Sequence, residues 1–287
     1  MTELQVGTVA AIRRYPVKSM LGEAVPSGSL GERGLEGDRA YALVDDETSK
    51  VVSVKRPRRW GRMFELTGET SAEGVVVRFA DGARLGIDDP ALAARLSDLF
   101  GRAVSVATVP PPDATFDEQW MHDLKNGVDP YFDLPVRAEG DEDDLIDGGQ
   151  FMSSSGTFFN YGAVHLVTTG TTRRLGELAP DSRFDPHRFR PNLVVETEAE
   201  GFVETEWPGR RLTIGDVELS VSFTVPRCVM TTLAQGDLPA DRAVLRAITE
   251  HNSVDCLGSG TLYPCVGVYA DVVTGGSVAV GQPVVLG

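Results

Sequence analysis

The chain has little positive charge. Lys and Arg number 27 against 42 Asp and Glu, so the formal net charge is −15. Proteins that bind nucleic acid usually present a basic field, and anionic membrane surfaces attract basic segments. The sequence therefore predicts no nucleic-acid partner and no membrane partner.

Cysteine and long apolar runs are also scarce. The three cysteines are Cys228, Cys256 and Cys265, too few for a typical secreted disulfide scaffold or for the four thiolates of an iron–sulfur cluster. The N-terminus has neither the basic segment nor the apolar run of a signal peptide. No stretch reaches the roughly 18 apolar residues of a membrane span. These absences predict a cytoplasmic location.

The common catalytic motifs are missing. The chain has no P-loop, no G-x-G-x-x-G after a strand and no G-x-S-x-G turn. It has four histidines, and none is paired at the spacing of a zinc site. His165 lies in an apolar strand, where it is either a core residue with satisfied hydrogen bonds or the base of a dyad with Cys228.

The remaining pattern is that of a globular, strand-rich protein. Of the 287 residues, 41% are hydrophobic, enough for a substantial core. Short apolar strands are separated by turns such as Asp81-Gly82, and a helix over 90–100 begins at Asp89-Pro90 and ends at Gly101. We predict a mainly β protein with some α, formed by two β-rich, barrel-like domains with peripheral helices. Residues 1–112 and 150–287 form the two domains, and an acidic, turn-rich linker over 113–149 joins them.

Cys228 is the cysteine with the most reactive surroundings. It follows a predicted strand over 217–223, and Arg227 beside it would favour the thiolate, which is the form that binds metal or attacks. A buried structural thiol is the alternative. Cys256 and Cys265 lack the close spacing of zinc ligands, and we interpret both as structural.

Basic residues are grouped in three segments, at 15–19, 55–62 and 183–192. If the segments converge, Lys and Arg could bind one anion such as a phosphate, with Ser and Asn donating neutral hydrogen bonds. The alternative is that each group offsets local acidic charge or covers apolar surface.

Five motifs resemble the MOSC proteins, named for the C-terminal domain of molybdenum-cofactor sulfurase. Tyr15-Pro-Val-Lys-Ser19 and Gly37-Asp-Arg-Ala-Tyr41 resemble the N-terminal β-barrel domain of that family. The later motifs resemble the MOSC domain itself: Phe189-Arg-Pro-Asn-Leu-Val-Val195, the run from Leu212 to Leu219 with Arg227-Cys228-x-x-Thr-Thr232, and Val280-Gly-Gln-Pro-Val284. The resemblance covers nearly the whole chain, and assigns 1–112 and 150–287 to these two domains.

The resemblance implies a molybdenum cofactor, a molybdenum-pyranopterin, held between the domains. It implies Cys228 as the catalytic residue and metal ligand, and a separate set of cofactor-binding residues: Lys18, Ser19, Arg39, Asn160, Tyr161, Arg190, Asn192, Arg227 and Tyr269. A soft thiolate suits a metal already bound by sulfur. The chain would then be an oxidoreductase that reduces small N-hydroxylated substrates.

Two features leave alternatives open. Pro226 stands where relatives often have Ser, so a polar contact near the metal is expected to be missing. The chain has no spare cysteines for a ferredoxin-like domain, so a separate electron-donor protein is expected. The alternative function is a non-redox carrier of the cofactor, or of sulfur as a persulfide on Cys228. The phosphate-binding set favours the enzyme, because a sulfur carrier would not need it.

Overall fold

The computed structural model describes most of the 287 residues. It covers 3–111, 114–119, 128–129, 134–135, 137–139, 142–148, 157–256, 258 and 260–287. Parts of the predicted acidic linker over 113–149 lie outside these residues, and its boundaries remain a prediction.

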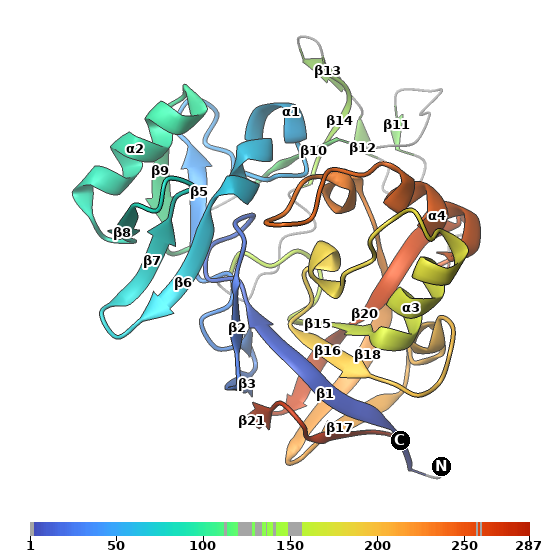
Figure 1. The fold of residues 1–287 in the computed structure, drawn as a ribbon. Helices are drawn as coiled ribbons and strands as arrows, with labels where there is room; N and C mark the ends of the chain where they lie inside the picture. Colours follow the sequence, from blue (N-terminus) through green and yellow to red (C-terminus); the bar gives the residue numbers. More distant parts are fainter. Residues whose placement is uncertain are drawn as a thin grey trace.

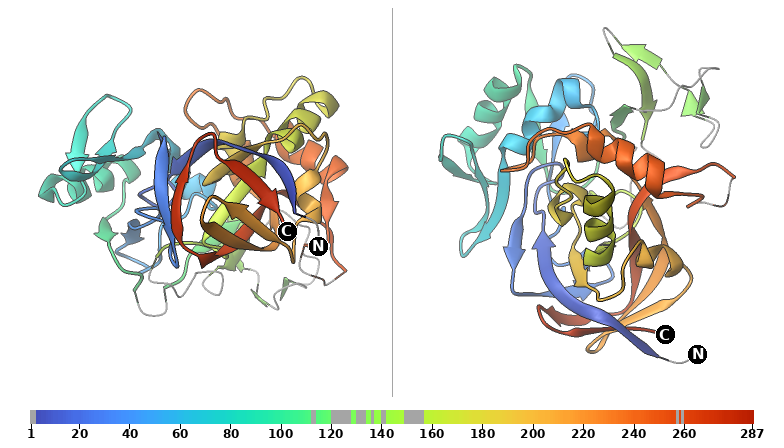
Figure 2. Two further views of the ribbon diagram at one scale, coloured as in Figure 1. Left: turned by 90° about the horizontal axis from the view of Figure 1, so that it is seen from below. Right: turned by 45° about the vertical axis from the view of Figure 1, so that its right-hand side comes forward.

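Seven strands close a barrel at the centre of the fold. In spatial order they are β15 (Val164–Thr168), β16 (Leu193–Glu196), β1 (Leu4–Arg14), β22 (Pro283–Leu286), β17 (Arg211–Ile214), β18 (Val217–Pro226) and β20 (Tyr263–Thr274), which pairs back to β15. Strands β15 and β16 are parallel, and the other neighbours are antiparallel. Figure 2 shows the closed ring end-on in its left view. The barrel thus joins the first strand of the chain to strands from its second half, and the mainly β prediction is confirmed.

Alternating side chains fill the barrel. Along β18, Val217, Leu219 and Val221 are buried while the residues between them are more exposed, the period of two that a strand with one buried face requires. Leu166 on β15 and Val268 on β20 join the same core. The interior is a packed core, so the cavity described below lies beside the barrel.

The N-terminal half adds a second core next to the barrel. It is formed by β5 (Ala42–Asp45) with β9 (Val104–Ala107), by the meander β6 (Thr67–Ser71), β7 (Gly74–Arg78) and β8 (Arg84–Gly86), and by α1 (Pro57–Trp60), the 3₁₀ helix η1 (Gly61–Glu65) and α2 (Pro90–Phe100). Val17, Leu43, Met63 and Leu96 are among its buried side chains. Figure 1 shows this unit above and to the left of the barrel, with α2 at its edge.

Helix α2 begins and ends where the sequence predicts. The Asp89 side chain accepts a hydrogen bond from the Ala91 backbone N–H at 2.8 Å, which satisfies one of the unpaired donors of a helix start. Pro90 occupies the first helical position, where no N–H is needed. Gly101 ends the helix with a φ of +63°, a left-handed conformation that costs glycine little.

Two helices cover the outside of the barrel. Helix α3 (Thr169–Leu178) follows β15, and α4 (Ala243–His251) precedes β20 in the chain. Leu175 and Ile248 on the helices pack with Val167 and Val266 on the barrel strands. Short 3₁₀ helices connect the strands: η3 (Pro186–Phe189), η4 (Val203–Glu206) and η5 (Val229–Thr232).

Minor strands complete the described structure. They are β2 (Glu23–Val25), which pairs with β1; β3 (Ser27–Gly31), β4 (Gly34–Leu35) and β21 (Gly276–Ala279), which form one sheet; β19 (Ser253–Val254), which pairs with β20; and the outlying β10 (Asp117–Gln119), β11 (Val128–Asp129), β12 (Leu134–Pro135), β13 (Arg137–Glu139) and β14 (Glu142–Asp147). Pairing of β3 with β21 and of β1 with β16 ties the two halves of the chain together.

Candidate functional site

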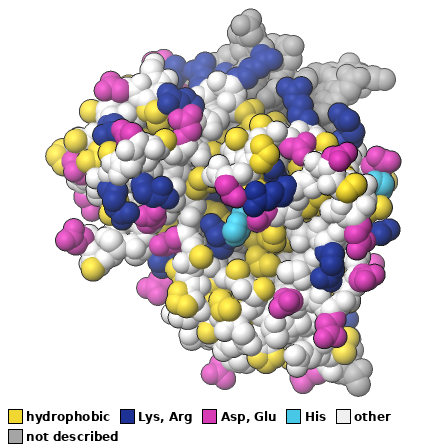
Figure 3. Space-filling view, in the orientation of Figure 1, with side chains coloured by type: hydrophobic (Ala, Val, Ile, Leu, Met, Phe, Trp, Pro, Cys, Tyr) yellow, Lys and Arg dark blue, Asp and Glu magenta, His cyan; other side chains and the backbone are white. Residues whose placement is uncertain are grey.

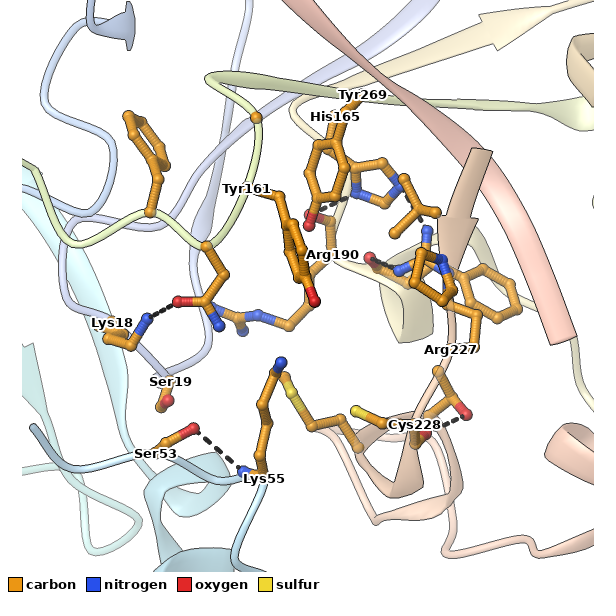
Figure 4. Close-up of a pocket in the computed structure, with 18 of the residues that line it drawn as sticks. Lys18, Ser19, Ser53, Lys55, Tyr161, His165, Arg190, Arg227, Cys228 and Tyr269 are labelled. Carbon is orange, nitrogen blue, oxygen red and sulfur yellow. Dashed lines mark hydrogen bonds between the residues drawn. The ribbon is translucent and has the colours of Figure 1, made fainter. Parts of the chain in front are cut away.

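A cavity lies where the N-terminal half meets the barrel. It contains about 1310 Å³ of empty space, including the part open to solvent. Its walls come from four stretches of the chain, at 18–55, 158–165, 188–192 and 225–231, with Glu118, Tyr263 and Tyr269 added. Figure 4 shows the side chains that point into it.

All ten residues that the sequence analysis selects line this cavity. They are Lys18, Ser19, Arg39, Asn160, Tyr161, Arg190, Asn192, Arg227, Cys228 and Tyr269. The structure thus brings them together from positions as distant as 18 and 269, while their individual roles remain predictions.

Lys18 forms one end of the site. Its Nζ donates to the Phe158 carbonyl at 2.9 Å and to Asn160 Oδ1 at 2.5 Å, so the residues in contact with the ammonium are neutral acceptors. Burial lowers the pKa of Lys18 well below its usual value, and the nearby charge of Lys55 lowers it further. An anion placed here would relieve both effects.

Two guanidinium groups share one aromatic ring. The Tyr15 ring lies 4.2 Å from the Arg190 guanidinium carbon and 4.8 Å from that of Arg39, within the range of cation–π attraction. Arg39 also pairs with the buried carboxylate of Asp38. Arg190 donates to the Met20 carbonyl at 2.6 Å, and burial lowers its pKa to about 10, with the charge of Arg39 acting in the same direction.

Four lining residues have left-handed backbone conformations. The φ angles are +65° at Ser19, +45° at Arg39, +67° at Tyr161 and +55° at Arg190. Non-glycine residues adopt this region rarely and at some energetic cost, and such residues concentrate at functional sites. The backbone therefore gives a second reason, independent of charge, to regard the cavity as the functional site.

The Asn192 side chain forms hydrogen bonds that connect several residues of the site. Its Nδ2 donates to Asp38 Oδ2 at 2.9 Å, and its Oδ1 accepts from the His165 backbone N–H at 3.2 Å and from Arg39 at 3.5 Å. The side chain is 1% exposed. Asn192 thus fixes the position of Arg39 and of the strand that carries His165.

Arg227 and His165 form a buried contact beside the cavity. Arg227 donates from Nε to the Val266 carbonyl at 2.9 Å and from Nη1 to the Phe189 carbonyl at 3.1 Å, and its Nη2 contacts His165 Nε2. Since Arg227 can only donate, Nε2 accepts, and the His165 proton is on Nδ1, which lies 3.2 Å from the Arg190 carbonyl. Burial lowers the pKa of His165, and Arg227 lowers it further, so the ring is neutral. His165 thus contacts Arg227 and Arg190, and the described hydrogen bonds do not include a Cys228–His165 dyad.

Gly267 makes room for this contact. It has a φ of +78°, and a Cβ at this position would lie 2.7 Å from His165 Nε2 and 2.3 Å from the Leu166 carbonyl oxygen. A side chain would displace His165 or the neighbouring strand, so the bend in β20 is part of the site.

Cys228 lies at the end of β18, just before η5, as expected for a strand-end turn. Its exposure is intermediate. Burial raises the pKa of the thiol, and Lys55 is the largest influence in the opposite direction. Arg227 also lowers the pKa of Cys228, as expected, but less than Lys55 does, and its guanidinium donates to the Val266 and Phe189 carbonyls.

Lys55 and Glu118 are site residues that the sequence analysis does not select. Lys55 Nζ pairs with Glu118 Oε2 at 2.7 Å, and both side chains are largely buried. Lys55 reaches into the cavity toward the side that carries Cys228 (Figure 4). The basic run at 55–62 gives a signal for Lys55, but Glu118 lies in the acidic segment interpreted as a linker, where nothing distinguishes it.

Arg188 is a further unselected residue, and it stabilises the segment after Cys228. Its guanidinium donates to four backbone carbonyls, at Arg183, Thr231, Leu233 and Pro239, over 2.8 to 3.3 Å. It is 1% exposed. Of the basic group at 183–192, Arg188 and Arg190 reach the cavity, whereas Arg183 pairs with Asp237 at the surface.

The aromatic wall is formed by two tyrosines. The rings of Tyr161 and Tyr269 stack with centroids 6.2 Å apart, and Tyr269 also contacts the His165 ring. Burial raises the pKa of Tyr161, so its hydroxyl stays protonated. The wall offers a flat apolar face with a hydroxyl at its edge.

The charge of the cavity contrasts with that of the chain. Six cations line it, namely Lys18, Arg39, Lys55, Arg188, Arg190 and Arg227, against Glu118 as the carboxylate among its described lining residues. On the outside, basic and acidic side chains are interspersed (Figure 3). Within the described residues no cluster of three or more His, Cys, Asp or Glu suits a metal ion by itself. The site therefore favours an anionic ligand and offers one thiol, Cys228.

Known protein families match both halves of the chain. Residues 6–105 match the MOSC N-terminal beta barrel domain, and residues 154–285 match the MOSC domain. Mitochondrial amidoxime reducing component 2 of Bos taurus is 35% identical over 98% of this chain and 83% of its own length, and that of Homo sapiens is 33% identical with the same coverage.

The chain belongs to the MOSC family. This family is associated with the molybdenum cofactor, and the curated relatives are named for the reduction of amidoximes. Among solved structures, the YUAD protein from Bacillus subtilis aligns over 99% of this chain and 97% of its own, with 11% identity and a TM-score of 0.46. In the part of the chain that the structure describes, no helix has both the length and the apolar character to cross a membrane.

Proposed function

We propose that this MOSC protein binds a molybdenum cofactor in the cavity and reduces small N-hydroxylated compounds with electrons from a separate donor protein. The observation that carries the proposal is the pairing of an excess of buried cations with one thiol in a single cavity. A molybdenum-pyranopterin has complementary chemistry, since its phosphate is anionic and its metal accepts soft sulfur ligands.

The donor set suits such a group. Lys18, Arg190 and Ser19 would hold the phosphate, because the two cations have neutral hydrogen-bond partners in the structure. Arg39, oriented by Asp38 and Asn192, would add a further donor. Cys228 would ligate the metal on the barrel side. When bound, the cofactor supplies the two-electron chemistry that reduces an N–O bond to an amine-type product and water.

The remaining residues define where a substrate can lie. Tyr161 and Tyr269 present flat faces that would orient a planar amidoxime-like group. Arg227 keeps its charge close to Cys228 while its donors are occupied by carbonyls and His165. Reduction of an N–O bond to water consumes two protons, and Lys55 with Glu118 holds an exchangeable proton at the cavity wall.

The first experiment measures molybdenum and oxidised pterin per chain after expression in a cofactor-producing host. We expect close to one of each for the wild type. Cys228→Ala should lose molybdenum, and Arg190→Ala should weaken cofactor retention about 10- to 100-fold, as expected for loss of a charged hydrogen bond. Arg183→Ala, which removes a surface arginine of the same segment, is the matched control and should behave as the wild type.

Substrate turnover then tests the reaction. Molybdenum-loaded protein should reduce an amidoxime or hydroxylamine with a reduced viologen dye as electron source. Loading without turnover would count against the reductase. A well-folded wild type without metal or pterin would reject the proposal and direct attention to a persulfide on Cys228, which is the carrier alternative.

A further inference from the structure

Cys256 and Cys265 lie together beside the cavity. They are 9% and 0% exposed and pack with Tyr263 in one small cluster. Tyr263 also lines the cavity. In the barrel, Cys265 is opposite Pro226, and the backbone N–H of Arg227 donates to the Pro264 carbonyl at 2.7 Å. The two thiols are thus next to the strand that leads to Cys228 but separate from the proposed ligand.

Backbone hydrogen bonds position both cysteines, Cys265 within a strand and Cys256 in a turn. Cys265 exchanges two hydrogen bonds with Asn252: its N–H donates to the Asn252 carbonyl at 2.9 Å, and Asn252 Nδ2 donates to the Cys265 carbonyl at 2.7 Å. The N–H of Cys256 donates to the Val254 carbonyl at 2.9 Å, which turns the chain after β19 so that Cys256 folds back toward β20.

The side chains of Cys256 and Cys265 interact within this cluster. This contact raises the pKa of Cys256 and lowers the pKa of Cys265. The two side chains pack in the same cluster, and Cys265 has the greater thiolate character of the pair. A thiolate next to a second thiol is the arrangement in which oxidation ends in a disulfide rather than in a higher oxide.

We propose that Cys256 and Cys265 form a redox-active dithiol that hydrogen peroxide converts to an intramolecular disulfide. The Cys265 thiolate attacks one peroxide oxygen, the O–O bond breaks, and hydroxide leaves as the sulfur becomes a sulfenic acid. Cys256 then attacks that sulfur, the S–O bond breaks, and water leaves. In total two thiols and one peroxide give one disulfide and two waters, with the sulfurs oxidised by two electrons and the peroxide reduced by two.

This modification site is independent of the proposed reductase activity. Peroxide is small and uncharged, so it can enter the cluster from the side of Cys256, which is 9% exposed, rather than from the side of Cys265, which is 0% exposed. Cys228 does not take part in the reaction.

The sequence allows a direct measurement of the bond. No Lys or Arg follows Arg246, so trypsin releases both cysteines in the peptide 247–287, whereas Cys228 falls in the peptide 228–242. The full-length folded protein is treated with hydrogen peroxide, unfolded in denaturant with N-ethylmaleimide, digested and weighed by mass spectrometry.

We expect the peptide 247–287 to carry no maleimide and to weigh 2 Da less than the dithiol form, and dithiothreitol to restore two maleimide sites. Cys228→Ser should give the same result. Cys256→Ser should prevent the mass loss and leave Cys265 as a sulfenic acid that dimedone traps.

Three results would overturn the proposal. One is a peptide 247–287 that keeps two maleimide sites at a peroxide dose that fully oxidises Cys228. Another is a sulfinic acid on either cysteine of the wild type in place of the 2 Da loss. The third is a cross-link between the peptides 228–242 and 247–287. The molybdenum content decides the proposed function separately, so each idea can fail alone.

Discussion

Replacing Arg188 should destabilise the protein more than replacing any other arginine near the site. Arg188→Met keeps much of the apolar stem but removes five N–H donors from a side chain that is 1% exposed. Four backbone carbonyls lose a donor, including those of Thr231 and Leu233 in the segment that follows Cys228.

The magnitude can be worked from the hydrogen-bond lengths. The bonds to the Arg183 and Pro239 carbonyls are 2.8 Å long, and the two others are 3.3 Å. A hydrogen bond to a charged group contributes about 1.5–3 kcal/mol net. Counting only the two short bonds at the lower value gives about 3 kcal/mol, a large share of the roughly 5–15 kcal/mol by which proteins are stable.

The assay is urea unfolding of cofactor-free protein, followed by tryptophan fluorescence, with Arg183→Met as the control. Arg183 is 53% exposed at its side chain and pairs with Asp237 at the surface, so its loss should cost less than about 1 kcal/mol. Arg188→Lys should be intermediate, because a single ammonium cannot reach all four carbonyls. If Arg188→Met and Arg183→Met unfold at the same midpoint, the structural role assigned to Arg188 is incorrect.

Three further predictions concern the buried charges of the cavity. His165→Leu removes the acceptor for Arg227 and should lower the free energy of unfolding by about 1–3 kcal/mol, while His165→Gln should recover part of it; equal midpoints for the two variants would refute this role. The pKa of Lys18 is lowered in the folded state, so the unfolded chain binds more protons between the folded pKa and the usual value of 10.5. The free energy of unfolding should therefore rise with pH across that window, by up to about 1.4 kcal/mol per pH unit. Lys18→Met should flatten this slope in denaturation curves measured at several pH values, and an unchanged slope would contradict the prediction. Lys55→Met leaves the buried Glu118 carboxylate without its partner and should cost about 3–5 kcal/mol, most of which the double variant with Glu118→Gln should recover; a double variant as unstable as the single would contradict a coupled pair.

Local sequence signals predict the regular elements well. The helix at 90–100 is fixed by Asp89, Pro90 and Gly101, all of which act within one turn of its ends. The strands Val164–Thr168 and Leu193–Glu196 are short runs of mainly β-branched and apolar residues, and such a run between turns indicates a buried strand. The order of strands in the barrel cannot be predicted from local sequence signals. No local feature of Leu4–Arg14 shows that this strand lies between β16 and β22.

The candidate site is predictable only where a motif marks it. Resemblance at Lys18, Arg190 and Cys228 selects residues that the fold does bring to one cavity. Glu118 and His165 carry no motif, and their positions follow from long-range pairing that a single sequence does not reveal. Arg227 shows a further limit. Its adjacency in sequence correctly predicts that it lowers the pKa of Cys228, but the larger effect comes from Lys55, which is distant in sequence. Adjacency also does not predict that the guanidinium donates to the Val266 and Phe189 carbonyls.

The left-handed residues explain how a site of this charge is maintained. Cations that repel one another would move apart in a flexible chain, yet Ser19, Arg39 and Arg190 are held at positive φ angles by backbone bonds such as those from Arg39 N–H to the Tyr15 carbonyl and from Arg190 N–H to the His187 carbonyl. The barrel and the N-terminal core therefore stabilise an arrangement that is unfavourable without a ligand. Binding of an anion would relieve both the repulsion and the burial of uncompensated charge, so the cofactor-loaded protein should unfold at a higher temperature than the cofactor-free protein. The difference should be smaller in Arg190→Ala, because less repulsion remains for the anion to relieve.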